Sequence, residues 1–388
     1  MEAGRAFNAT SIIGLGEFSG NVWAGGIKPW AKQLIIYEIY DIGNNSLLAA
    51  YFLGQVGLDW EPAGGLAGVD SQPVGLRLSG INTSLGRFFD SDTSDMMLRN
   101  ATSGQFEVYD IRNNNITSAT GLGSVLANSQ VAGFGDFNGD GMTDMMVRDA
   151  IFGTFTAYDI SNNIVVANAT LGTVGIEWQV AGFGDFNGDA TSDMMLRNVI
   201  SGAFELYDIS NNAITGAFSA GTVGQDWLVA GFGNFSSNPG ETDMLLRNAL
   251  TGAFQVYDIR NNTLVSSSSL GTVGIDWQVV GFGPVSGTGH SDMVLRNVIS
   301  GVFELYDISN NHITATASLG SVGIDWQVAG IAANSAPAAM GASDGSNSQL
   351  VQAMAAFGGG GRAAERLDTA SLAADATQQP LLATPQHA

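Results

Sequence analysis

The chain of 388 residues contains no cysteine, only three histidines and only 14 lysines and arginines. Without cysteine it can form no disulfide, no thiolate nucleophile and no cysteine-based zinc or iron–sulfur site. The 36 acidic residues outnumber the basic ones and give a net charge of −22, which repels nucleic acid and anionic membrane surfaces. We therefore expect no nucleic-acid partner. The same charge suits cation binding, and it serves simple solubility as well.

Long apolar runs are also missing. No stretch approaches 18 uninterrupted apolar residues, so we expect no transmembrane segment. The first residues, Met1–Thr10, lack the basic region followed by an apolar run that marks a cleavable secretory signal.

Glycine, in contrast, is abundant. The chain has 52 glycines and 45% hydrophobic residues, but only 13% charged residues. Few charges together with many Gly, Asn, Ser and Thr residues favour short strands and tight turns over helices.

The sequence repeats itself about every 49 residues. A Ser-Asp-Met-Met-Leu-Arg-Asn string, or a close variant, recurs with steps of 49, 49, 50 and 49 residues. Its aspartates are Asp95, Asp144, Asp193, Asp243 and Asp292. A Tyr-Asp-Ile string has the same spacing from Tyr109 onward, and an earlier copy at Tyr40 precedes Tyr109 by 69 residues. The longer first step places an insertion within Glu61–Asn82.

One unit divides into four short segments with strand character. The pattern predicts strands at Trp178–Phe186, Asp193–Asn198, Ala203–Ile209 and Ala213–Ala220, with turns at Ser201-Gly202 and Asn211-Asn212. Four short strands in a unit of this length are typical of a propeller blade. No segment of the repeat holds a 3.6-residue period, which disfavours a helical solenoid.

The units can be counted from their first strands. They begin near Gly14, Gly86, Gly133, Gly182, Gly231 and Gly281. A further partial copy, Trp326–Ile331, can complete the first blade and close the ring. We therefore predict an all-β fold, a β-propeller of four-stranded antiparallel blades over residues 1–331. Six blades are favoured, and seven are the alternative if the insertion holds a degenerate unit.

Two loops carry the motif Asp-x-Asn-x-Asp-Gly-x-x-Asp or a close form of it. They are Gly133-Phe-Gly-Asp-Phe-Asn-Gly-Asp-Gly-Met-Thr-Asp144 and Gly182-Phe-Gly-Asp-Phe-Asn-Gly-Asp-Ala-Thr-Ser-Asp193. These strings resemble the FG-GAP/VCBS repeat, and the resemblance extends over about Gly14–Ile331. It implies a β-propeller, often of seven blades, with calcium bound between the first two strands of a blade. Relatives occur in integrin ectodomains and in bacterial surface or secreted proteins, which implies adhesion, recognition or scaffolding.

The spacing of the acids itself suits a calcium ion. Calcium takes six to eight oxygen ligands, and carboxylates at alternate loop positions can converge on it. The predicted metal ligands are Asp136, Asn138, Asp140, Met142 and Asp144 in the first loop, and Asp185, Asn187, Asp189, Thr191 and Asp193 in the second. Met142 would contribute its carbonyl oxygen. The alternative interpretation is Asn/Asp-Gly turns with incidental acids. Repetition within the chain favours structural Ca²⁺.

The other units depart from this motif. Asn234–Asp243 has an extra residue and Pro239, Pro284–Asp292 keeps only its last acid, and Glu17–Gly25 has lost most oxygens. In Arg87–Asp95 the acids Asp90, Asp92 and Asp95 form an irregular candidate. We expect two good sites and one doubtful one.

Arginine and aspartate each recur once per unit. The arginines are Arg99, Arg148, Arg197, Arg247 and Arg296, and the aspartates are Asp110, Asp159, Asp208, Asp258 and Asp307. We predict an Arg–Asp pair in each blade, because lone charges are rarely buried. A ring of arginines that binds an anionic ligand is the alternative. The repeated Trp and the Met pairs are interpreted as core residues, although Trp could also stack on sugars.

Catalytic motifs are scarce. His290, His312 and His387 fall in a loop, after a turn and near the C-terminus, and no nucleophile–base order or phosphate loop is visible. We therefore expect a non-enzymatic protein, with a hydrolase as the less favoured alternative.

After Ile331 the repeat stops. Residues 332–388 are rich in Ala, Gly and Ser and are interpreted as a flexible tail, with a short amphipathic helix over Gln349–Phe357. An acidic, cysteine-free repeat protein of this kind resembles substrates of bacterial type I secretion. We expect an extracellular or cell-surface propeller that binds a protein or glycan ligand. The alternative is a purely structural module of a larger surface assembly.

Overall fold

The computed structural model describes residues 10–18, 34–43, 45–57, 59–63, 85–86, 95–112, 115–125, 128–238, 242–283, 285, 291–324 and 326–333. Several predictions fall wholly or mostly outside these residues. They are the insertion within Glu61–Asn82, the candidate loop Arg87–Asp95, the degenerate loops Glu17–Gly25 and Pro284–Asp292, His290, His387, and the tail with its helix at Gln349–Phe357.

The described chain consists of strands joined by turns and loops. The first strands are β1 (Thr10–Phe18), β2 (Leu34–Gly43), β3 (Ser46–Gly57), β4 (Trp60–Pro62), β5 (Leu85–Gly86), β6 (Asp95–Asn100), β7 (Gln105–Arg112) and β8 (Asn115–Ser124). The next eight are β9 (Ser129–Gly135), β10 (Asp144–Asp149), β11 (Thr154–Ser161), β12 (Ile164–Thr173), β13 (Trp178–Gly184), β14 (Asp193–Asn198), β15 (Ala203–Ser210) and β16 (Ala213–Thr222). The last are β17 (Trp227–Gly233), β18 (Asp243–Asn248), β19 (Ala253–Arg260), β20 (Thr263–Thr272), β21 (Trp277–Gly283), β22 (Asp292–Asn297), β23 (Val302–Ser309), β24 (His312–Ser321) and β25 (Trp326–Ala333).

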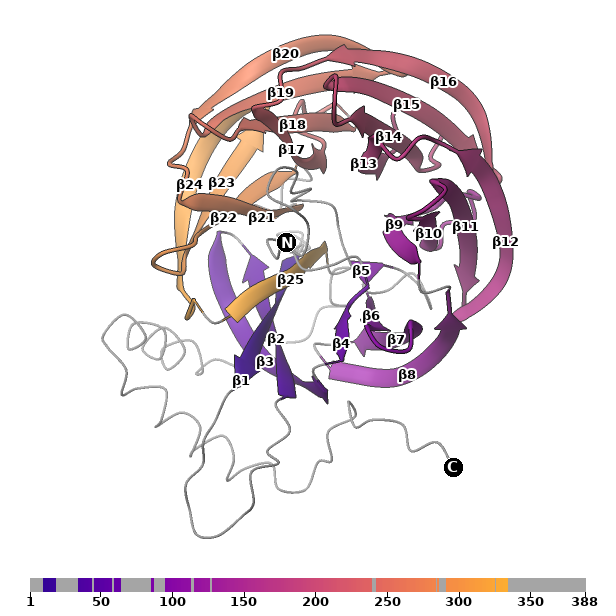
Figure 1. The fold of residues 1–388 in the computed structure, drawn as a ribbon. Coiled ribbons are helices and arrows are strands. Elements are labelled where there is room, and N and C mark those ends of the chain that lie inside the picture. Colours follow the sequence, from indigo (N-terminus) through magenta and orange to yellow (C-terminus); the bar gives the residue numbers. More distant parts are fainter. Residues whose placement is uncertain are drawn as a thin grey trace, which may run out of the picture.

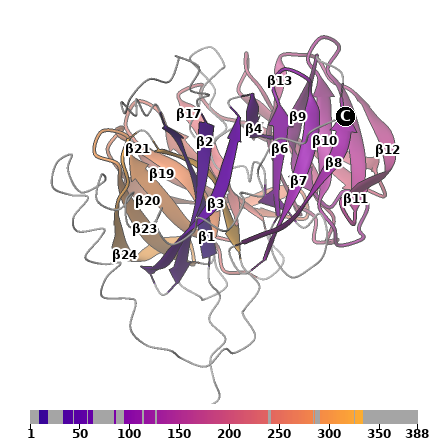
Figure 2. The ribbon, with the colours of Figure 1, turned by 90° about the horizontal axis from the view of Figure 1, so that it is seen from below.

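These strands form antiparallel sheets arranged as the blades of a propeller (Figure 1). Four sheets contain four consecutive strands each: β9–β12, β13–β16, β17–β20 and β21–β24. In a fifth, β4 and β5 both pair with β6, which continues to β7 and β8. Seen from the side, β1–β3 and β6–β8 run across the thickness of the ring (Figure 2). The all-β propeller of four-stranded antiparallel blades is confirmed, and the strands of the Trp178 unit lie where the sequence places them.

The two ends of the repeat region meet in one sheet. Strand β25 pairs with β1, and the sheet continues to β2 and β3. The partial copy that starts at Trp326 therefore supplies the first strand of the blade that contains β1.

Asn-Asn turns join the third and fourth strands of the four blades from β9 to β24. Asn211 and Asn212 have φ angles of 49° and 57°, and Asn162, Asn163, Asn261, Asn262, Asn310 and Asn311 are similar. A two-residue hairpin turn of type I′ needs positive φ at both central residues, and asparagine tolerates this conformation better than most residues. The predicted turn at Asn211-Asn212 is therefore confirmed.

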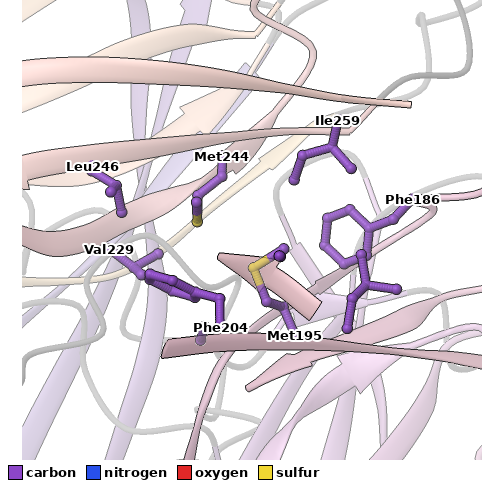
Figure 3. Packing of buried hydrophobic residues seen from close by; sticks show 10 residues of the cluster. Phe186, Met195, Phe204, Val229, Met244, Leu246 and Ile259 are labelled. Carbon is purple, nitrogen blue, oxygen red and sulfur yellow. The ribbon is translucent and has the colours of Figure 1, made fainter. Parts of the chain in front are cut away.

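The hydrophobic core lies between neighbouring blades. One cluster joins Phe186, Met195 and Phe204 of one blade to Met244 and Leu246 of the next (Figure 3). Trp227 packs against the same cluster and is only partly buried. The interpretation of the Met pairs and of this Trp as core residues is confirmed.

Glycine allows the blades to approach one another closely. A Cβ atom at Gly182 would overlap the ring of Phe232 on the next blade, and Gly133 meets Phe183 in the same way. The first Gly of the Gly-Phe-Gly strings at Gly133 and Gly182 is thus required by the Phe of the neighbouring blade.

Strand direction divides the loops between two faces of the ring. The loop between the first and second strands and the turn between the third and fourth lie on one face, which carries the acidic loops and is called the acidic face below. The connection between blades and the turn between the second and third strands lie on the opposite face.

Each arginine of the repeat clamps the next connection on this opposite face. Arg148 Nη1 donates to the carbonyl oxygen of Trp178 at 2.5 Å, and Nη2 donates to that of Gly175 at 2.9 Å. Its guanidinium also lies over the ring of Phe155, 5.0 Å from the centroid. Arg197, Arg247 and Arg296 repeat the contact with carbonyls and with a Phe ring.

The repeated aspartates bind elsewhere, on the acidic face. Asn212 Nδ2 donates to Asp159 of the preceding blade at 2.6 Å, and Asn262 donates to Asp208 at 2.9 Å. The pairs Asn163–Asp110 and Asn311–Asp258 are alike, and Asn45 joins Asp307 across the place where the chain ends meet. The predicted Arg–Asp pair is therefore wrong, because the two side chains lie near the ends of neighbouring antiparallel strands, on opposite faces of the ring, and bind different residues of the next blade.

Replacing Arg197 by Met should lower the free energy of unfolding by about 3 kcal/mol, since it removes two charge-assisted hydrogen bonds and leaves carbonyl groups without a donor. Arg197 is only 1% exposed, whereas Arg260 is exposed and serves as the control. Urea denaturation measures both variants. Equal losses at the two positions would contradict the clamp.

Candidate metal centre

The two acidic loops occupy equivalent places on the acidic face. Asp136–Asp144 connects β9 to β10, and Asp185–Asp193 connects β13 to β14, so each loop joins the first two strands of a blade. Phe137 and Phe186 point inward from these loops and are 0% and 1% exposed. The buried Phe anchors each loop, while Asp136 and Asp140 in the first loop and Asp185 and Asp189 in the second remain partly or fully exposed.

The first acid of each loop organises the backbone around itself. Asp136 accepts hydrogen bonds from the amides of Gly139 at 2.7 Å, Asp140 at 3.2 Å and Gly141 at 2.8 Å. The chain thus wraps around one carboxylate. Gly141 has a φ of 83°, a conformation that glycine adopts without strain.

Asn138 and Asp140 face each other next to this carboxylate. Asn138 Oδ1 accepts from the amide of Asp140 at 2.8 Å, and its Nδ2 lies 3.1 Å from Oδ2 of Asp140. Asp140 in turn accepts from the amide of Met142 at 2.8 Å. The structure therefore brings Asp136, Asn138 and Asp140 together in one turn of the loop.

The second loop repeats this geometry with two differences, at the positions of Gly141 and Met142. Asp185 accepts from Gly188, Asp189 and Ala190. Ala190 stands where the first loop has Gly141, and it keeps a φ of 70°. Thr191 Oγ1 lies 2.5 Å from Asp189 Oδ1 and 2.6 Å from the carbonyl oxygen of Ile209, which ties this loop to β15.

The last acid of each motif lies behind the loop, in the blade interior. Asp144 is fully buried, and its two oxygens accept the amides of Phe137 and Ile160, both at 3.0 Å. Asp193 accepts those of Phe186 and Ile209. Asp243 makes the same contacts with Phe235 and Ile259 in a blade without an acidic loop. This position thus has a structural role that does not depend on a metal ion.

Burial changes the acidity of these carboxyl groups. The pKa of Asp144 is raised to about 7, mainly because burial disfavours the charged form and also because Asp159 and Asp140 lie near. The pKa of Asp193 is raised to about 7 for the same reasons, with Asp208 and Asp189 as the neighbouring acids. The two amide donors act in the opposite direction and lower the pKa.

Each acidic loop is held by the blade that follows it. The amide of Ser192 donates to the carbonyl oxygen of Asp136 at 2.7 Å, and the amide of Asn212 donates to that of Phe137 at 3.0 Å. The hydroxyl of Ser192 accepts from the amide of Asp136 at 3.1 Å. These contacts were not predicted from the sequence. The signal for them was a Ser or Thr that recurs directly before the aspartate at the start of each second strand.

The fit to calcium can be judged from these contacts. Asp136, Asn138 and Asp140 present side-chain oxygens at the surface of one loop, and Asp185, Asn187 and Asp189 do so in the other. Hard oxygen donors of this kind suit calcium. In the described part of the chain no three His, Asp or Glu side chains are grouped closely enough to hold a metal ion by themselves. A bound ion would therefore also need Asn and carbonyl oxygens, and Asn138 would have to turn its Nδ2 away from Asp140.

The sequence matches no model of a known protein family, and no curated protein matches it. Solved structures that resemble the fold include regucalcin, a calcium-binding protein from Agrobacterium tumefaciens, at 11% identity and a TM-score of 0.38 over 64% of this chain and 79% of that chain. A DUF4221 family member from Bacteroides vulgatus has 10% identity and a TM-score of 0.41 over 71% and 95%.

The dihydro-heme d1 dehydrogenase NirN is also similar, at 12% identity and a TM-score of 0.36 over 74% of this chain. The match spans only 54% of the NirN chain. Identities and scores of this size assign no activity or ligand. Among the described residues, no helix is long and apolar enough to cross a membrane.

Ala190 and Gly141 form a natural pair of reciprocal tests. We expect Ala190→Gly to raise the free energy of unfolding by about 1 kcal/mol, because positive φ strains a residue with a Cβ atom. Gly141→Ala should lower it by a similar amount, since no atom lies within 4 Å of the added Cβ and only the φ strain acts. Chemical denaturation in a chelating buffer measures both. Changes of the same sign would contradict this account.

The raised pKa of Asp144 predicts a pH dependence of stability. Between about pH 4 and pH 7 the unfolded chain releases this proton while the folded chain retains it, so the free energy of unfolding falls as pH rises. In chelating buffer, Asp144→Asn should show a smaller fall than the wild type. The control is Asp149→Asn, because amides of Phe152 and Ile151 lower the pKa of Asp149 and its titration lies below this range. An identical slope in wild type and Asp144→Asn would contradict the prediction.

Proposed function

We propose that this chain is a calcium-binding β-propeller whose two acidic loops each hold one structural Ca²⁺ ion. The observation that supports this most directly is the convergence of Asp136, Asn138 and Asp140 on one turn, repeated by Asp185, Asn187 and Asp189. Both turns lie at the surface, where an ion can enter. The carbonyl oxygens of Met142 in the first loop and Thr191 in the second follow these side chains, and each would add one ligand.

A cation would stabilise these loops for an electrostatic reason. Asp136 and Asp140 lie in one short loop, with Asp144 and Asp159 behind it, so the carboxylates repel one another. A divalent ion would remove this repulsion and fix the loop. Because the loop is bonded to Ser192 and Asn212 of the next blade, the ion would also strengthen the contact between blades.

The acidic side chains of Asp144 and Asp193 would act from behind the loop. Each already accepts two amides, and a carboxylate has further lone pairs for a metal ion. A direct ligand role for Asp144 and Asp193 remains part of the proposal.

We further propose that six blades complete the ring and that the units belong to the FG-GAP/VCBS type. The β25–β1 pairing and the Asn45–Asp307 hydrogen bond support closure at six. The Gly-Phe-Gly-Asp-Phe string, whose Gly and Phe join neighbouring blades, supports the repeat type.

The function that agrees best with these features is recognition or adhesion outside the cell, with a protein or glycan as the ligand. The favoured alternative is a structural module of a larger surface assembly. Absence of catalysis is likewise a proposal. It is supported by His312, the one histidine among the described residues, whose Nδ1 lies 2.7 Å from the carbonyl oxygen of Asn310 on an exposed turn. A glycan array and a pull-down separate recognition from a purely structural role.

Calcium titration of the full chain by calorimetry should give about two sites. At a calcium concentration about a hundredfold above the dissociation constant, each site adds roughly 2.7 kcal/mol to the free energy of unfolding. Asp140→Ala and Asp189→Ala should each remove one site, and the double variant should show no change in Tm on addition of chelator.

Asn238→Ala provides the matched control, since it alters the equivalent loop of a blade without the acids and should leave both sites intact. The proposal is wrong if the wild-type Tm does not respond to chelator, or if the double variant still binds two ions.

A further inference from the structure

The exposed hydrophobic side chains of this propeller are concentrated on one face. All those more than 60% exposed lie in the connections and turns of the face opposite the acidic loops. Together with Val298, 43% exposed, they form what we call the apolar rim: Ile151, Phe152, Ile176, Ile200, Leu250, Ile275, Val298, Ile299 and Ile324. The other exposed large hydrophobic side chains of the described residues lie on the outer strands β3, β12, β16 and β20.

Backbone hydrogen bonds hold the segments of the rim in an unbroken series. The amide of Val174 donates to Gly153, that of Val199 to Glu177, and that of Val223 to Gly202, at 3.1, 2.8 and 3.1 Å. The series continues through Ala249–Asp226, Val273–Gly252, Val298–Asp276 and Val322–Gly301. The apolar side chains therefore project from a fixed frame, and such pre-organisation reduces the entropy lost on binding.

The rim is also close to electrical neutrality. The arginine clamps interact with the carboxylates of the connections that they hold: Arg148 with Glu177, Arg197 with Asp226, and Arg247 with Asp276. The guanidiniums are occupied by carbonyl oxygens, so they are not available to an anionic ligand. The acidic loops are at the other ends of the strands, and Asp149, which accepts the amides of Ile151 and Phe152, is a further acid beside the rim.

We propose that the apolar rim binds the apolar rim of a second copy of this chain and forms a face-to-face dimer with two-fold symmetry. Copies with a charge of −22 repel each other through most of their surface. When two rims meet, a strand length of roughly 20 Å separates each acidic face from the interface, more than two Debye lengths at physiological salt. The charge-balanced rim is thus the face by which two copies can approach.

The exposed area agrees with such an interface. Full burial of an aliphatic side chain corresponds to roughly 60–120 Å² of apolar surface. The nine rim side chains, mostly about two-thirds exposed, therefore present roughly 400–700 Å². A standard interface takes about 800 Å² from each partner, and the loop backbone between the rim side chains can supply the remainder.

The composition of the rim favours a protein surface over a lipid surface. Its side chains are Ile, Leu and Val with a single Phe, and Glu177, Asp226 and Asp276 stand beside them. Membrane-binding surfaces commonly use Trp, Tyr and free Lys or Arg at the lipid headgroups. A second copy, which offers the same aliphatic side chains, is complementary to the rim.

Sedimentation equilibrium of the full chain in chelating buffer tests the proposal independently of calcium. We expect a wild-type dimer with a dissociation constant on the order of 10 μM or below, unchanged or tighter at high salt. The triple variant Ile200→Asp, Leu250→Asp and Ile299→Asp should raise the dissociation constant at least about a hundredfold, because it places charges in the centre of the contact. These side chains are 77%, 77% and 73% exposed, so the variant should fold with an unchanged Tm.

The matched control adds the same charge away from the rim. Ile164→Asp, Val166→Asp and Val265→Asp lie on β12 and β20, are 60%, 60% and 51% exposed, and should leave dimerisation unaltered. A monomeric wild type at high concentration, a rim variant that still dimerises, or equal loss in both triple variants would overturn the proposal. Binding of a monomeric wild type to phosphatidylcholine vesicles would replace it with a lipid surface.

The absence of native cysteine allows a second measurement of the same contact. A single Thr251→Cys variant on the rim should be alkylated more slowly as protein concentration rises, whereas Ser267→Cys on β20 should react at a constant rate. Both positions are exposed in a single copy. Constant reactivity of the Thr251→Cys variant in a dimeric sample would place the contact elsewhere and overturn the proposal.

Discussion

The joint between neighbouring blades is the constraint on which the rest of this propeller depends. A four-stranded blade cannot bury both its faces alone, and its Phe, Met and Leu side chains become core only against the next blade. Polar contacts at both ends fix the register of this packing. In the joint between the blades β9–β12 and β13–β16, the Arg148 guanidinium donates to carbonyl oxygens of the connection at one end, and Asn212 donates to Asp159 at the other. A repeat of 49 residues carries one copy of each half of the joint.

The same joint positions the candidate metal loops. The loop at Asp136 is bonded through its backbone to Ser192 and Asn212, which belong to the following blade. Its shape is therefore a property of two units, and a loop sequence can be complete while its geometry depends on a neighbour. Calcium, if bound as proposed, would act on the joint as well as on the loop.

Much of the fold could be predicted from the sequence because its signals are local. Alternating apolar and polar residues predicted the strands, and Asn211-Asn212 predicted a turn. The 49-residue period predicted one blade per repeat. The Arg–Asp pair was predicted wrongly because periodicity says that two residues recur together, not that they meet. Strand direction held the missing information: Arg148 lies near the end of β10 and Asp159 near the end of β11, and antiparallel neighbours end on opposite faces. The role of Asp144 was harder to predict from the sequence. An aspartate at this position of the loop motif can be a metal ligand, and it can equally accept hydrogen bonds from backbone amides.

Antiparallel strands also explain why one repeat produces two unlike surfaces. Successive connections lie on opposite faces of the ring. The acidic loops and the aliphatic side chains of the apolar rim are therefore on different faces. A metal ion needs only one loop, and two intact acidic loops are enough for two sites whatever the remaining blades contain. A docking face needs side chains from many blades on the same face of the ring. The apolar rim fits this requirement, because each complete blade from β9 to β24 contributes one aliphatic residue at the same repeat position: Ile151, Ile200, Leu250 or Ile299. The distribution of residues among the units therefore separates a local role for the acidic face from a collective role for the rim.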